Sequence, residues 1–234
     1  MKHFEYRQND REVRATIVRV ITDRLQRRAE SNWSANDFDF RTAYLENVEF
    51  TEAIFSGTTR FDDATFDGTT SFLLATSNGL TSFDRATFNS DAMFIATTFA
   101  GSSTSFDRAT FNGDAVFGAT AFIKKVSFAA ATFTGTATFT GATFVNAVFS
   151  GTTFGAADFN RAAFAMYVLF SGLPSTGTPF FWEPLSVPSR SKRPPSTVTH
   201  RSIRQILVVV VQISSKLASQ GEALFRAPTL AVSL

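Results

Sequence analysis

The sequence TSFDRATFNSDAMF occupies residues 81–94, and a nearly identical sequence, TSFDRATFNGDAVF, occupies residues 104–117. In the first copy a phenylalanine recurs after five residues and then after six, at Phe83, Phe88 and Phe94. Similar spacing continues in both directions, from about Phe40 to Phe164. The chain therefore contains a long array of short repeats, and such self-similarity is the sequence signature of a repeat architecture.

The composition of the chain supports one structural position repeated many times. Its 234 residues include 28 Phe, against 2 Trp and 3 Tyr. A hydrophobic content of 44% rules out a fully disordered chain. A core that uses Phe almost alone indicates that equivalent positions recur along the array.

The centres of the repeats can be read along the whole array. Steps of five dominate at its ends, fives and sixes alternate in its middle, and Ser77 stands where one centre is expected. Counting Ser77, there are 24 centres. The apolar centres are Phe40, Leu45, Phe50, Phe55, Phe61, Phe66, Phe72, Phe83, Phe88, Phe94, Phe99, Phe106, Phe111, Phe117, Phe122, Phe128, Phe133, Phe139, Phe144, Phe149, Phe154, Phe159 and Phe164.

A period of five fits neither a 3.6-residue helix nor a strand that alternates every two residues. It fits a coil with flat sides, in which each side takes about five residues and then turns a corner. A small residue stands two before most centres, as at Ala86, and it also points inward because side chains alternate along an extended segment. The unit Ala-Thr-Phe-x-Gly predicts Phe and Ala inside and Thr, Asp, Asn and Arg outside.

This unit resembles the bacterial pentapeptide-repeat family, whose consensus is Ala-(Asp/Asn)-(Leu/Phe)-x-x. The resemblance implies an all-β solenoid, a right-handed quadrilateral β-helix with four repeats in each coil. Four centres per coil give about six coils, and the six-residue steps are interpreted as one-residue corner insertions or bulges. The array resembles a Phe-centred branch, and its basic lead-in with Trp33 before Asp37 resembles actinobacterial members.

The chain divides into four regions. Residues 1–37 form an amphipathic helix and lead-in, and residues 38–170 form the repeat β-helix. Residues 171–200 are a Pro/Ser-rich linker, and residues 201–234 are a helical or mixed tail. The helix is expected over residues 10–29, covering the first coil with an apolar stripe of Val13, Ile17, Val20, Ile21 and Leu25.

The candidate interaction surface consists of charged residues that recur with the coil. A coil of about 22 residues aligns three aspartates on one column, two arginines on the neighbouring column and two further aspartates elsewhere. Such repetition follows from stacking geometry and does not indicate a catalytic acid and base. These residues are Asp62, Asp84 and Asp107; Arg85 and Arg108; and Asp91 and Asp114.

The sequence lacks the residues and motifs that several kinds of metal-binding, phosphate-binding and catalytic site require. Without cysteine, and with His3 and His200 at opposite ends, the chain offers no cysteine or multi-histidine metal site. No phosphate-binding glycine loop and no nucleophile-elbow motif are present. We expect a protein without enzymatic activity and without a cofactor, with no transmembrane segment, located in the cytoplasm.

Three functions fit such a rod. The first is a scaffold for protein–protein interaction with an unidentified partner, or with a second copy through an uncapped coil end. The alternative is a DNA mimic that modulates DNA gyrase or topoisomerase, as the family resemblance implies for some members. The array has 7 basic and 12 acidic residues, far fewer than DNA of equal length, and direct nucleic-acid binding is not expected. The third is ice binding through Thr columns such as Thr65, Thr87 and Thr110.

Overall fold

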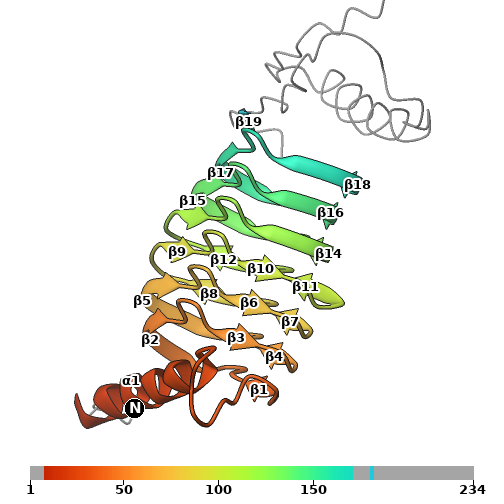
Figure 1. Cartoon of the computed structure of the whole chain (residues 1–234). Helices are drawn as coiled ribbons and strands as arrows, with labels where there is room; N and C mark the ends of the chain where they lie inside the picture. Colours follow the sequence, from red (N-terminus) through yellow and green to blue (C-terminus); the bar gives the residue numbers. More distant parts are fainter. Residues whose placement is uncertain (1–7, 171–179, 182–234) are drawn as a thin grey trace, which may run out of the picture.

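The computed structural model describes residues 8–170, 180 and 181 of the chain. One helix, α1 (Gln8–Leu25), lies at the beginning of a stack of coils, and short strands lie side by side up the stack (Figure 1). Every strand pairing is parallel. The predicted β-helix with an N-terminal α-helix is confirmed as a parallel β-solenoid of about six turns.

The strands form two sheets, and each sheet covers two adjacent sides of the coil. The longer strands of each sheet run from one side around a corner to the next, whereas elsewhere the two sides carry separate short strands. The first sheet contains β1 (Phe38–Asp39), β3 (Ile54–Phe55), β4 (Thr59–Arg60), β6 (Thr76–Ser77), β7 (Thr81–Ser82), β10 (Thr98–Phe99), β11 (Ser103–Ser105), β14 (Ala121–Ser127), β16 (Thr143–Val148) and β18 (Ala163–Leu169). The second contains β2 (Tyr44–Glu49), β5 (Thr65–Ser71), β8 (Thr87–Phe88), β9 (Ala92–Met93), β12 (Thr110–Phe111), β13 (Ala115–Val116), β15 (Thr132–Thr138), β17 (Thr153–Asp158) and β19 (Phe180–Phe181).

The centres stack in four columns, one on each side of the coil. We call the sides first, second, third and fourth, in chain order from Phe40. The first side contains Phe40, Phe61, Phe83, Phe106, Phe128, Phe149 and Phe170; the second contains Leu45, Phe66, Phe88, Phe111, Phe133 and Phe154; the third contains Phe50, Phe72, Phe94, Phe117, Phe139 and Phe159; and the fourth contains Phe55, Ser77, Phe99, Phe122, Phe144 and Phe164.

The rings within a column lie nearly parallel, except that Phe50 is tilted by 43° relative to Phe72 at the beginning of the third column. On the second side the centroids of Phe88 and Phe111 are 4.6 Å apart, with 2° between the ring planes. Rings of the first and third columns, on opposite sides of the coil, meet edge to face, as Phe94 meets Phe106 at 5.5 Å and 86°. Both arrangements are favoured by the aromatic quadrupole, so each phenylalanine stabilises the coil above, the coil below and its own coil.

Two kinds of corner alternate around each coil. Five-residue steps join the first side to the second and the third to the fourth, and a backbone hydrogen bond closes each of them, as from Ala64 N to Phe61 O at 3.1 Å. Asp63, the third residue of that turn, has φ +57°, which is the pattern of a type II turn. Six-residue steps form most of the other corners.

The register of the sheets shows what the sixth residue does. Phe122 pairs with Phe144 and Lys125 pairs with Asn146, with a register shift between the two pairs. The step that follows Phe122 has six residues, whereas the step that follows Phe144 has five. The extra residue is therefore accommodated as a bulge at the corner, in agreement with the interpretation made from the sequence.

Helix α1 packs against the first coil through a face that coincides only in part with the predicted stripe, since Ile21 and Leu25 contact the core as predicted. Leu25 and Val18 are buried, whereas Val13 and Ile17 are 56% and 52% exposed. Val20 is exposed as well. The stripe prediction was wrong on these three residues because Val18 lies about 100° around the helix from Ile17 and shares a face with Leu25.

Polar contacts fix the position of α1 on the coil. Arg14 donates to Glu46 at 3.0 Å, and the Thr22 hydroxyl donates to the Glu49 carbonyl at 2.9 Å. The Gln26 amide donates to the Thr51 carbonyl at 3.0 Å. The helix thus covers part of the open end of the β-helix with both apolar and polar contacts.

Candidate interaction surface

The structure places all seven predicted surface residues on the two corners that border the second side. Asp62, Asp84 and Asp107 directly follow the centres Phe61, Phe83 and Phe106 of the first side. Arg85 and Arg108 come next along the chain, in the turn itself. The remaining pair, Asp91 and Asp114, lies at the corner between the second and third sides.

The first three aspartates join successive coils. The Ser82 hydroxyl donates to Asp62 Oδ1, and the Ser105 and Ser127 hydroxyls donate to Asp84 and Asp107 in the same way. The Asp107 Oδ1 also accepts a hydrogen bond from Ala129 N at 2.9 Å. These half-buried carboxylates therefore hold the stack together, and they are less available to a partner than the sequence predicted.

Replacing Asp107 with alanine is expected to lower the free energy of unfolding by about 1–2 kcal/mol, because the buried Ser127 hydroxyl loses its acceptor. Asp107→Asn keeps an oxygen at the same place and should stay within about 0.5 kcal/mol of wild type. Urea unfolding of both variants measures the difference. Equal losses in the two variants would show that the carboxylate is not a structural acceptor.

Arg85, the first arginine of its column, forms an ion pair that was not predicted from the sequence. Arg85 Nε and Nη2 each donate to Asp63 of the preceding coil at 2.7 Å, one to each carboxylate oxygen. The hydrogen bonds and charge of Arg85 lower the pKa of Asp63. Among the described residues Arg108 has no ion-pair partner, so it presents an exposed, uncompensated positive charge.

The other corner of the second side is acidic and exposed. Asp91 Oδ1 accepts from Asp114 N at 2.9 Å, and Asp114 Oδ1 accepts from Thr136 N at 2.8 Å. Each carboxylate thus caps the backbone of the next coil with one oxygen. The column keeps two negative charges at the surface, in fixed positions.

Between the two corners runs a row of amide and carboxylate side chains. The Asn89 amide donates to Asp67 Oδ1 at 3.3 Å, and the Asn112 amide donates to Asn89 Oδ1 at 3.4 Å. The Tyr44 hydroxyl donates to Asp67 Oδ2 at 2.6 Å, and this bond is the main reason that the pKa of Asp67 is lowered. Their recurrence one residue after Phe66, Phe88 and Phe111 was the sequence signal that could have revealed this row.

The second side is consequently a surface of charged and polar groups in fixed positions. One edge carries Arg85 and Arg108 together with the aspartates Asp62, Asp63, Asp84 and Asp107. The other edge carries Asp91 and Asp114, and the row of Asp67, Asn89 and Asn112 lies between the two edges. Among residues 8–170, 180 and 181, no three acidic or histidine side chains gather to hold a metal ion. Within the same residues, no helix has the length and apolarity to cross a bilayer.

A sequence profile of pentapeptide repeats, nine copies long, matches residues 50–98. No curated protein is significantly similar to the chain in sequence. Among solved structures, the chain is similar to HetL, a pentapeptide repeat protein involved in heterocyst differentiation regulation from the cyanobacterium Nostoc sp. strain PCC 7120. The identity is 14% over 63% of this chain and 93% of HetL, with a TM-score of 0.13, which is too distant to bear on function.

Proposed function

The chain is a pentapeptide-repeat protein, and we propose that its β-helix is a non-catalytic scaffold that binds a protein partner through the second side. The observation that supports this proposal is the fixed pattern of charges on that side, with exposed Arg108 at one edge and exposed Asp91 and Asp114 at the other. Charges of both signs in fixed positions favour one orientation of a charged partner and disfavour others. A surface already held by hydrogen bonds between coils also loses little conformational freedom on binding.

The charges of the second side do not favour mimicry of DNA. Duplex DNA presents a negative charge about every 1.7 Å along its axis. Here Arg85 and Arg108 occupy successive coils at one edge, where a DNA mimic needs negative charge. Inhibition of DNA gyrase supercoiling by the purified protein at micromolar concentration would favour the mimic over the scaffold.

A charge-removing variant of the second side tests the proposal. Arg108→Gln removes the positive charge, and Asp91→Asn and Asp114→Asn remove the negative charges while keeping side-chain shape and the capping oxygens. The matched control is Lys124→Gln with Lys125→Gln, two exposed residues after Phe122 at the corner between the fourth and first sides. Tagged forms of all three proteins are expressed in the source cells, and bound proteins are quantified by mass spectrometry after mild cross-linking.

We expect at least one protein that is enriched by wild type and by the lysine control but not by the second-side variant. Three exposed charges at about 0.5 kcal/mol each correspond to roughly tenfold weaker binding. Partners retained equally by all three proteins, or no partner at all, would count against the proposal. Light scattering separates the remaining alternative, a homodimer through the coil end, whose mass would not change in the variant.

The cytoplasm remains our expectation for its location. A chain without cysteine is compatible with a reducing compartment. Fractionation of the source cells provides the measurement.

A further inference from the structure

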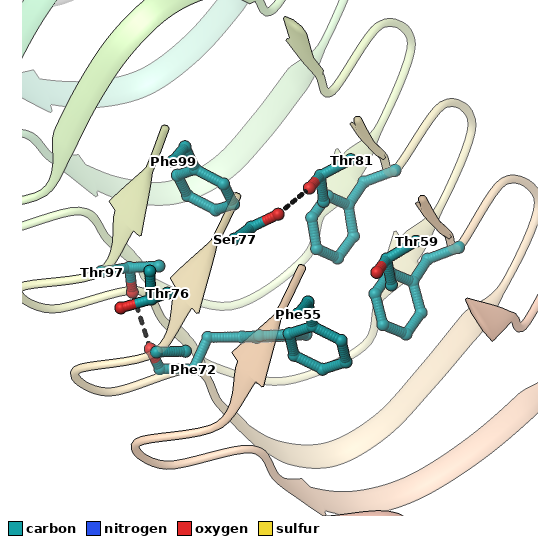
Figure 2. Close-up of a pocket in the computed structure, with 11 residues that line it drawn as sticks. Phe55, Thr59, Phe72, Thr76, Ser77, Thr81, Thr97 and Phe99 are labelled. Atoms are coloured by element: carbon teal, nitrogen blue, oxygen red, sulfur yellow. Dashed lines mark hydrogen bonds between the residues drawn. The ribbon is translucent and has the colours of Figure 1, made fainter. Parts of the chain in front are cut away.

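The fourth side has one interruption in its column of rings. Ser77 pairs in register with Phe55 below and Phe99 above, and it occupies the place of a centre. Figure 2 shows Ser77 between these two rings, with Thr59 and Thr81 on the adjoining strands. A serine replaces a phenyl ring here, so space opens inside the β-helix.

The space is a small cavity of about 10 Å³, with Phe55, Thr59, Ser77, Thr81 and Phe99 among its lining residues. This volume, measured for the centre of a water-sized sphere, is close to the minimum that holds one water molecule. A phenyl ring or a larger apolar ligand does not fit.

One of these hydroxyls is buried without a partner. Thr59 is 1% exposed, and among the described residues its Oγ1 makes no hydrogen bond. Its hydroxyl faces the same space as Ser77 (Figure 2). Leaving a buried hydroxyl unsatisfied is unfavourable, and most such groups in proteins bind protein or ordered water.

The neighbouring hydroxyls have unused bonding capacity. Ser77 and Thr81 are hydrogen-bonded to each other, and either of them can be the donor. The Gly79 carbonyl, 3.4 Å from Ser77 Oγ and 3.5 Å from Thr81 Oγ1, accepts from the other hydroxyl. Each hydroxyl has two acceptor positions, so the pair can still accept a hydrogen bond from a further molecule. Three buried residues with hydroxyl groups, Thr59, Ser77 and Thr81, therefore line a volume of about one water.

We propose that this cavity is a binding site for a single structural water, which bridges Thr59 Oγ1 to the Ser77–Thr81 pair. Buried waters typically make about three hydrogen bonds, and these groups supply that number. The water takes the place of the missing ring and links the coil of Thr59 to the coil of Ser77 and Thr81. It is a part of the fold at the one centre that is not apolar.

A crystal structure of the full chain and the melting temperature of Thr59→Val test this site together. Valine is compatible with this column, because Thr81 pairs with Thr104, and Thr104 pairs with Val126. The matched control is Thr104→Val, which makes the same exchange at a buried residue that does not line the cavity.

We expect electron density for one water within about 3.2 Å of Thr59 Oγ1 and of a Ser77 or Thr81 hydroxyl. We also expect Thr59→Val to melt about 2–4 °C below Thr104→Val, because the bridging water loses a partner. An empty cavity would overturn the proposal. So would a Thr59→Val variant that melts at or above the control, since relief of an unsatisfied hydroxyl then explains the result.

Discussion

Phe111→Ala is expected to lower the free energy of unfolding by about 3–5 kcal/mol, a large share of the stability of a typical domain. Phe111 is fully buried, and its ring lies 4.6 Å from the rings of both Phe88 and Phe133. Alanine would remove both stacking contacts at once and leave a cavity in the middle of the column. Urea unfolding followed by circular dichroism measures the loss.

The control for this variant is Leu74→Ala, at a corner residue that is 49% exposed. We expect it to remain within about 0.5 kcal/mol of wild type. A loss below about 1 kcal/mol for Phe111→Ala would mean that the stacked rings do not form a packed interior.

Gly79→Ala is expected to destabilise the protein by about 3 kcal/mol, although it adds a single methyl group. A Cβ at Gly79 would lie 1.9 Å from the carbonyl oxygen of Gly57 in the coil below. The obstructing atom belongs to the backbone, so two coils must separate locally. Hydrogen bonds beside this point, such as Asn78 N to Phe55 O at 2.7 Å, would lengthen as a result.

Gly118→Ala provides the matched control, because the nearest atom to its added Cβ is 3.9 Å away. This variant should melt at or slightly above the wild-type temperature, since alanine restricts the unfolded chain. Thermal unfolding of both variants by calorimetry separates close packing from a general intolerance of alanine. Similar melting temperatures would contradict the close approach at Gly79.

The interior of the β-helix could be predicted from the sequence because one rule governs it. A large residue every five or six positions, with a small one two before, fixes which side chains point inward. Phe61, Phe66, Phe83, Phe88, Phe106, Phe111, Phe128 and Phe133 are all buried, at 0–1% exposure. Even the irregular position, Ser77, pairs in register with Phe55 and Phe99, where a centre was expected.

The periodicity of the sequence does not determine which face of helix α1 contacts the first coil, or which surface residues form hydrogen bonds between coils. Helix α1 has valines and isoleucines on more than one face, and its sequence alone does not say which face meets the coil. Val18 and Leu25 were selected by contact with the first coil. Likewise, Asp107 recurs with the repeat, but only the position of Ser127 one coil later makes it a structural acceptor. The Ser-Phe-Asp motif at residues 105–107 was the available signal for such bonds.

Deletion of one whole coil tests most directly the claim that the chain closes a four-sided coil every 20 to 23 residues. Removing residues 107–128 joins Phe106 to Ala129, so the next centre, Phe133, again follows after five residues on the second side. Removing two residues fewer, 107–126, places Phe128 two positions after Phe106, in the turn. The measurement is the far-ultraviolet circular dichroism of both proteins during thermal unfolding. Our account predicts a native β spectrum with a cooperative transition for the first deletion and loss of both for the second; equal behaviour of the two deletions would contradict it.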